Sequence, residues 1–92
     1  MAVVYKARDI EHAIQIANDV PFGLGASIQT QDADLAADIA DKLDVGMVTI
    51  NAPSGSEANT PFGGVKRSGF GRELGTLGIT EFLNHKLIRD KS

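Results

Sequence analysis

The sequence contains no cysteine, and its only histidines are His12 and His85. Without cysteine the chain can form no disulfide, no thiolate nucleophile and no cysteine-ligated metal site. Two histidines are too few to complete a zinc site, so the sequence predicts no metal centre. These absences exclude thiol chemistry as something that this chain performs by itself.

Long apolar runs and a secretory leader are also absent. No apolar run approaches the roughly 18 residues that a membrane-spanning helix requires. The first ten residues, MAVVYKARDI, lack a basic flank followed by an apolar core and a small-residue cleavage site. We therefore expect no membrane partner and no export, and the expected location is the cytoplasm.

Charge and size are those of one small globular domain. The 92 residues are 42% hydrophobic and 23% charged, with a net charge of −3. Residues 1–44 carry eight acids and three bases, whereas residues 62–92 carry three acids and six bases. In the basic half, glycines separate the cations and Phe70 is the nearby aromatic residue, which is a poor platform for stacking bases. We expect no nucleic-acid partner.

Hydrophobic periodicity predicts two helices. The first is expected at about residues 10–18 with Asp9 as its N-cap. The second is expected to begin after Asp32 and to be followed by Gly46 as the left-handed residue that ends it. The apolar stripes at helical spacing are Ile10, Ala13, Ile14 and Ala17 in the first helix, and Leu35, Ala36, Ile39, Ala40 and Leu43 in the second.

Three short apolar runs, at residues 3–5, 24–30 and 47–51, predict strands that alternate with these helices. The order β-α-β-α-β indicates an α/β fold with a partial parallel open sheet. A glycine-rich loop and a short helix are expected to follow. Ligands of open sheets bind beyond the carboxyl ends of the strands, where Asn51 and the loop 52–60 are expected.

The glycine-rich stretch PFGGVKRSGFGRELGTLG, residues 61–78, holds six of the ten glycines. Its GFGRELG is one residue off the dinucleotide fingerprint and does not directly follow a predicted strand. Its GGVKRS lacks the adjacent Gly-Lys-Ser/Thr of a phosphate-binding P-loop. From the residues alone, tight turns and close backbone packing are the favoured interpretation.

Three motifs together carry a family resemblance: GMVTIN at 46–51, PFGGVKRSGFGRELG at 61–75 and GITEFLNHKLI at 78–88. The sequence resembles the C-terminal segment of the NAD(P)-dependent aldehyde dehydrogenase superfamily, and most closely its succinate-semialdehyde dehydrogenase-like members. The resemblance implies that residues 1–82 are the C-terminal part of a catalytic domain. It implies that residues 83–92 are an oligomerisation strand and tail.

The resemblance also implies what this chain does not contain. Enzymes of the family oxidise an aldehyde through a cysteine nucleophile and a glutamate base, with NAD or NADP as the hydride acceptor. Those residues and the cofactor-binding domain lie upstream of the segment resembled here, and family chains are several times longer. We therefore expect a fragment that is inactive alone, holds no catalytic cysteine and binds no cofactor by itself.

Four residues are implied to take part in a complete enzyme. Phe62 corresponds to an aromatic residue that lines the substrate tunnel, although a purely packing role stays open. Glu73 corresponds to an acid linked to proton relay, with pairing to Arg72 or Lys66 as the alternative. Asn51 is expected either to contact substrate or to fix the following loop, and the Ser56 hydroxyl to meet a substrate carboxylate.

Two further classes of function stay open. The chain is an interaction module if the segment 83–90 pairs with a neighbour as an edge strand, which predicts a homo-oligomer. A separate upstream aldehyde dehydrogenase fragment is a second expected partner. The chain is a small ligand-binding domain if the glycine-rich loop forms an anion-binding nest of N–H groups.

Overall fold

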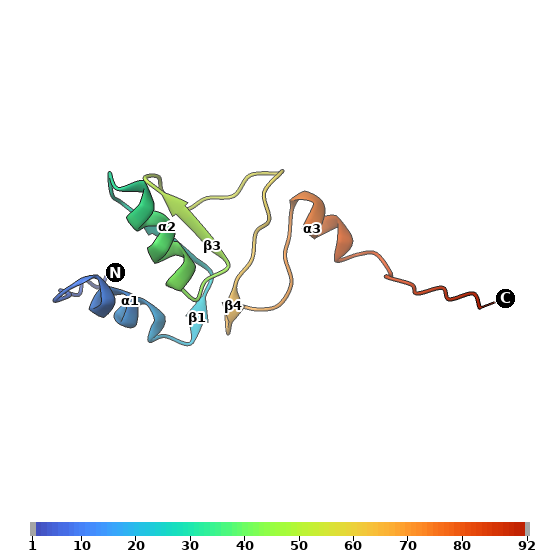
Figure 1. The fold of residues 1–92 in the computed structure, drawn as a ribbon, viewed down its shortest axis with the longest axis horizontal. Helices are drawn as coiled ribbons and strands as arrows, with labels where there is room; N and C mark the ends of the chain where they lie inside the picture. Colours follow the sequence, from blue (N-terminus) through green and yellow to red (C-terminus); the bar gives the residue numbers. More distant parts are fainter. Residues whose placement is uncertain (1, 92) are drawn as a thin grey trace.

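The computed structural model describes residues 2–91. The elements in chain order are α1 (Ile10–Asn18), β1 (Phe22–Gly23), β2 (Gly25–Ile28), α2 (Ala33–Lys42), β3 (Met47–Ile50), β4 (Val65–Lys66) and α3 (Gly75–Thr80). Figure 1 shows the first two helices and the strands gathered at one end, with α3 and the C-terminal segment reaching away from them. The molecule therefore measures 63 × 28 × 28 Å along its principal axes.

Both predicted helices are confirmed, and each begins at the predicted cap. The carboxylate of Asp9 accepts the N–H of His12 at 2.8 Å. The carboxylate of Asp32 accepts the N–H of Leu35 at 3.1 Å. In both cases a side-chain oxygen satisfies one of the free N–H groups of the first turn, which is why the helices start there.

The prediction that Gly46 ends α2 in a left-handed conformation is wrong. The helix ends at Lys42, and Gly46 is not among the described residues with positive φ. Its N–H donates to the carbonyls of Gly23 and Leu24, at 3.0 and 3.2 Å. A Cβ on Gly46 would overlap the carbonyl of Gly63 and lie 2.6 Å from Cα of Gly64. Glycine stands here because two backbone segments cross in contact, which no larger residue permits.

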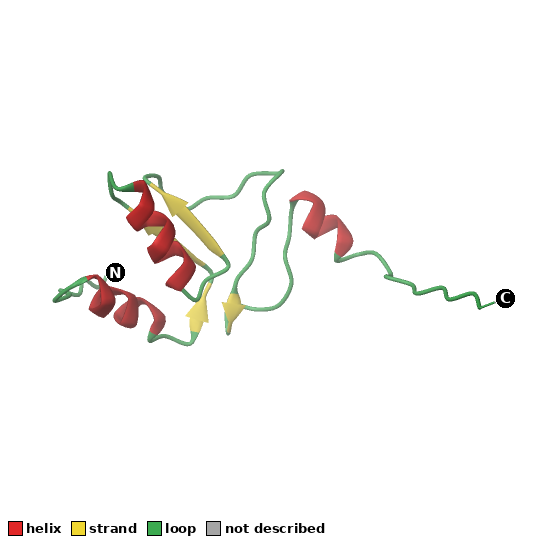
Figure 2. Ribbon diagram, viewed as in Figure 1, coloured by secondary structure: helices red, strands yellow, loops and turns green. Residues whose placement is uncertain are grey.

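The mixed α/β class is confirmed, but the strands form two separate pairs (Figure 2). β2 and β3 are parallel, with Gly25 opposite Met47 and Ile28 opposite Ile50. β1 and β4 are antiparallel, with Phe22 opposite Lys66. The expected first strand at residues 3–5 is not formed. A strand needs a hydrogen-bonded neighbour, and none of the described residues pairs with this segment.

The described residues bury little apolar surface. Ile28 and Ala36 form the buried apolar core, whereas large apolar side chains are exposed along the whole chain. The most exposed are Val4 at 92%, Phe70 at 103% and Phe82 at 93%. Such exposure is far above what a self-contained domain of this size leaves in water. The described residues therefore leave an unusually large apolar surface uncovered.

Residues 84–91 form neither helix nor strand with the rest of the described chain. They run outward beyond α3, with Leu87 and Ile88 about four-fifths exposed, at 79% and 81%. The segment 83–90 is expected to form a strand only by pairing with another chain, and that pairing stays a prediction. No helix of residues 2–91 has the length and apolar character needed to cross a membrane.

Candidate substrate-facing loop

The loop that follows β3 starts at the carboxyl edge of the parallel pair, as expected. Asn51 adopts φ 59°, and its side-chain amide bridges to Thr30, which lies beyond the end of β2. Its Nδ2 donates to the carbonyl of Thr30 and its Oδ1 accepts the N–H of Thr30, both at 2.9 Å. The Asn51 amide thus extends the hydrogen bonding between β2 and β3 beyond the ends of the strands. It also fixes the start of the loop at residues 52–60. Its contact with substrate stays a prediction.

Phe62 and Ser56 are brought to one hollow of about 390 Å³ beside the parallel pair. Phe62 is half-buried and Ser56 is exposed. Among the described residues the hydroxyl of Ser56 has no hydrogen-bond partner, so it is available to a ligand. The hollow is lined by Leu24, Gly25, Met47, Ser54, Gly55, Ser56 and Phe62, and none of these is charged. The chain offers an apolar wall and hydroxyl groups there.

Glu73 is tied to Phe62 through the backbone. The N–H of each residue donates to the carbonyl of the other at 2.7 Å, as an isolated antiparallel bridge. The bridge therefore holds the two backbones side by side. The carboxylate of Glu73 is exposed and, within the described chain, forms no ion pair. The alternative in which Glu73 pairs with Arg72 or Lys66 is not observed, and its part in proton relay stays a prediction.

The cations near the glycine-rich loop serve the backbone. Nη1 of Arg72 donates to the carbonyls of Gly64 and Gly71, at 2.9 and 2.8 Å. The ammonium of Lys66 donates to main-chain carbonyls at the end of α1. Arg67 lies with its guanidinium 5.9 Å from the ring centre of Phe22, within the range of a cation–π contact. These contacts give all three cations partners within the chain.

Several N–H groups of the glycine-rich loop are already used within the chain. The N–H groups of Ser68, Gly69, Glu73 and Gly75 already donate to backbone carbonyls at 2.7–3.3 Å. They are not free to converge on an anion as a nest does. The helix that follows, α3, has six residues and starts without a side-chain cap. No group of three metal-ligating side chains comes together in residues 2–91.

Sequence reasoning missed two features of the site. The Phe62–Glu73 bridge joins residues eleven positions apart and carries no periodic signal. The main-chain carbonyl of Asn18 and the carboxylate of Asp44 contact the ammonium of Lys66 and so help to hold the glycine-rich loop, and the contact with Asn18 spans 48 positions. The one local hint was Asn18 itself, because asparagine at a helix end often bonds to backbone.

Comparison with known proteins agrees with this description of an α/β segment with a glycine-rich loop at a sheet edge. The model of the aldehyde dehydrogenase family matches residues 1–88. The chain belongs to the aldehyde dehydrogenase family.

Two of the similar proteins are named for succinate semialdehyde. The chain is 53% identical, over 97% of its length, to the succinate-semialdehyde dehydrogenase [NADP(+)] of Deinococcus radiodurans. It is 49% identical over 96% of its length to the succinate semialdehyde dehydrogenase [NAD(P)+] of Escherichia coli K12. It covers 19% of each of these relatives.

A solved structure gives the same picture. The crystal structure of succinic semialdehyde dehydrogenase from Streptococcus pyogenes, in complex with NADP+, superposes with a TM-score of 0.88. The two sequences are 44% identical, and the match covers 94% of this chain and 19% of that one. The described chain therefore has the same fold as the matching segment of the much longer Streptococcus pyogenes enzyme.

Proposed function

We propose that this chain is the C-terminal part of an NAD(P)-dependent aldehyde dehydrogenase that oxidises succinate semialdehyde or a closely related aldehyde to the acid. The observation that carries the proposal is the 53% identity to a succinate-semialdehyde dehydrogenase over 97% of the chain. The placement of Ser56 and Phe62 in one hollow beside the parallel strands supports it. Ligands of such sheets bind at that edge.

In the complete enzyme the segment supplies the wall that faces the substrate. The ring of Phe62 forms the apolar side, and the Ser56 hydroxyl donates a hydrogen bond to the substrate carboxylate. Asn51 holds the start of the loop through Thr30. The Glu73 carboxylate passes protons between solvent and the general base, which lies outside this chain.

The catalytic thiolate and the dinucleotide site must come from outside these 92 residues. The sequence has no cysteine, and the N–H groups of Ser68, Gly69, Glu73 and Gly75 in the glycine-rich loop donate within the chain. When bound elsewhere in the enzyme, NAD or NADP accepts the hydride from the substrate. Without the thiolate there is no covalent intermediate from which a hydride could leave, so the proposed activity of the chain alone is nil.

The first test is the purified chain with NAD+ or NADP+ and a panel of aldehydes that includes succinate semialdehyde. We expect no reduction of either cofactor above a protein-free blank. Cofactor reduction in proportion to the amount of chain added would refute the proposal that the nucleophile lies outside this chain.

The second test is a chimera in which the matched segment of the Deinococcus radiodurans enzyme is replaced by this chain. We expect succinate-semialdehyde oxidation with NADP+. In the chimera, Ser56→Ala should raise KM for succinate semialdehyde about tenfold, as loss of one hydrogen bond to a charged group predicts. KM for butanal, which has no carboxylate, should change little. Ser54→Ala is the matched control in the same hollow, and an equal effect of both variants would contradict the role of Ser56.

A second function, as an interaction module, is favoured by the exposed apolar surface. Ile28 and Ala36 are buried, whereas Leu83, Leu87 and Ile88 of the C-terminal segment are 58%, 79% and 81% exposed. We propose that this segment pairs with a second copy as an edge strand, or that the apolar surface docks on a separate upstream fragment. Light scattering should give a dimer or larger species for the intact chain and a smaller species after deletion from Leu83 onward. A folded monomer for the intact chain would refute self-pairing.

A further inference from the structure

Lys66 adopts a backbone conformation that a side chain makes costly. It lies in β4 opposite Phe22, with φ 56° in the left-handed region. Residues with a Cβ enter this region at an energetic cost, and glycine or asparagine enters it more readily. A lysine in this place indicates that its side chain makes interactions which offset the backbone strain.

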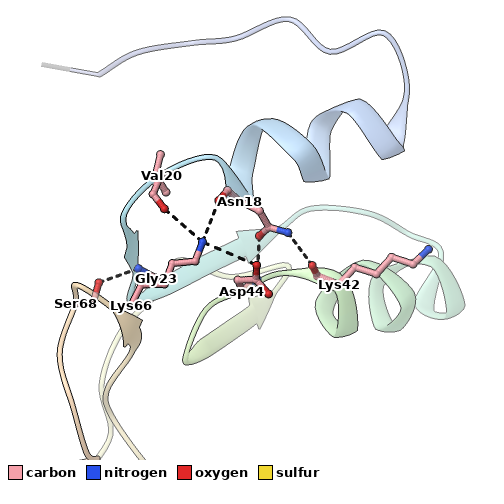
Figure 3. A network of polar contacts seen from close by, with 7 residues as sticks. All are labelled: Asn18, Val20, Gly23, Lys42, Asp44, Lys66 and Ser68. Atoms are coloured by element: carbon pink, nitrogen blue, oxygen red, sulfur yellow. Dashed lines mark hydrogen bonds and ion pairs between the residues drawn. The ribbon is translucent and has the colours of Figure 1, made fainter.

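The ammonium of Lys66 is directed at the end of α1 (Figure 3). Its Nζ donates to the carbonyl of Asn18 at 2.9 Å and to that of Val20 at 3.3 Å, and lies 3.9 Å from Oδ2 of Asp44. The last turn of α1 contains no basic residue of its own. Lys66 therefore supplies the cation that the free carbonyls at a helix C-terminus favour, from 48 positions further along the chain. Its side chain is 29% exposed, so water competes only in part for these contacts.

Neighbouring contacts make this a joint between three segments. Asn18 donates from Nδ2 to the carbonyl of Lys42 at the end of α2, and its Oδ1 accepts the N–H of Asp44, both at 2.9 Å. On the other side, the hydroxyl of Ser68 accepts the N–H of Gly23 at 2.9 Å. We call the side chains of Asn18, Asp44, Lys66 and Ser68 the Lys66 clamp. It ties the ends of both long helices to the glycine-rich loop.

The glycine-rich loop carries Phe62 and Glu73, two of the residues proposed above to serve the reaction. Phe62 lies four positions before Lys66, and the Phe62–Glu73 bridge closes the loop around it. We propose that Lys66 is a positioning residue: its bonds to α1 fix the Phe62–Glu73 bridge relative to the parallel pair and so set the distance from Phe62 to Ser56. The proposal rests on the function proposed above for Phe62 and Ser56. It adds a residue that never touches substrate.

Hydrogen exchange in the full 92-residue chain tests the clamp without reference to activity. The N–H groups of Gly23 and Arg67 donate across the joint, to Oγ of Ser68 and to the carbonyl of residue 21. Lys66→Met should lower their protection about tenfold, and Lys66→Arg should restore most of it, whereas the N–H of Ala36 inside α2 should be unaffected. Lys42→Met, which removes an exposed cation paired at i,i+4, is the matched control.

Three results would overturn the clamp. The first is unchanged protection of Gly23 and Arg67 in Lys66→Met. The second is a loss that is equal at Ala36, because Lys66 would then contribute to overall stability without holding the loop. The third is an unsubstituted chain with no protection at Gly23 and Arg67, because the joint would then not be closed.

The chimera tests what the clamp does for the reaction. Lys66→Met should raise KM for succinate semialdehyde about tenfold with kcat changed less than about twofold, and Lys66→Arg should return KM toward that of the unsubstituted chimera. A lower kcat with KM unchanged would mean less folded enzyme and would overturn the positioning role, as would unchanged kinetics. Inactivity of the unsubstituted chimera would instead refute the proposed function, and the exchange result would still decide whether Lys66 holds the loop.

Discussion

Gly46→Ala should destabilise the fold more than any other single methyl addition to the parallel pair. The new Cβ would overlap the carbonyl of Gly63 and lie 2.6 Å from Cα of Gly64. Carbon atoms in contact prefer about 3.5–4.0 Å, so the two backbones would have to separate by about 1 Å. The atoms in the way are backbone atoms, which cannot rotate aside as a flexible side chain can. Separation would also lengthen the bond from Gly46 N–H to the Gly23 carbonyl, now 3.0 Å.

The expected cost is about 3 kcal/mol, at the upper end of the usual range for overpacking. For a domain of this size each kcal/mol lowers Tm by roughly 4–8 °C, so the variant should melt roughly 12–24 °C lower. Circular dichroism during heating measures the shift. Gly55→Ala is the matched control, because a Cβ on Gly55 has no neighbour within 4 Å. If Gly46→Ala and Gly55→Ala melted at the same temperature, the crossing of the two backbones would be refuted as the reason for glycine.

Three further predictions concern caps and one ion pair. Asn51→Gly keeps the left-handed conformation but loses the two bonds to the end of β2, so it should lower the free energy of unfolding by about 1–2 kcal/mol in urea denaturation. Asp32→Ala should cost about 1 kcal/mol through loss of the α2 cap, whereas Asp34→Ala, which caps nothing, should cost less than half of that. The hydrogen bond that the Lys42 ammonium donates to the Asp38 carboxylate, at 3.0 Å, raises the pKa of Lys42 above its ordinary 10.5, so this pair stabilises the fold below that pH and the contribution fades as pH rises through the raised pKa. NMR titration should find the pKa of Lys42 above 10.5, and Asp38→Asn should bring it down.

The helices could be predicted from the sequence because their signals are local. Asp9 and Asp32 each stand before an apolar stripe, and each carboxylate reaches an N–H three positions on. The run at 47–51 likewise predicted β3, because its β-branched residues themselves favour an extended backbone. These features need no knowledge of the rest of the molecule.

The glycine-rich region could not be predicted in the same detail because its contacts are long-range. Gly46 follows a helix, which favours a left-handed cap, but the nearby backbone of Gly63 and Gly64 decides its conformation. The apolar run at 3–5 has strand composition, yet it has no hydrogen-bonding neighbour within the described chain. Sequence propensity states which conformation a segment favours, whereas strand formation requires a partner. The family resemblance, and not the residue pattern, brought Phe62, Glu73 and Ser56 forward.

The crossing at Gly46 has a consequence for how specificity could change in this family. Gly46 contacts Gly63 and Gly64, so the backbone returns after residues 47–62 to the place where it started. The exposed residues 52–60 form a loop above this crossing. Replacing them leaves the two ends of the loop, near Gly46 and Gly63, in place. The residues proposed above to meet the aldehyde can therefore change in length as well as in chemistry while both ends of the loop stay in place.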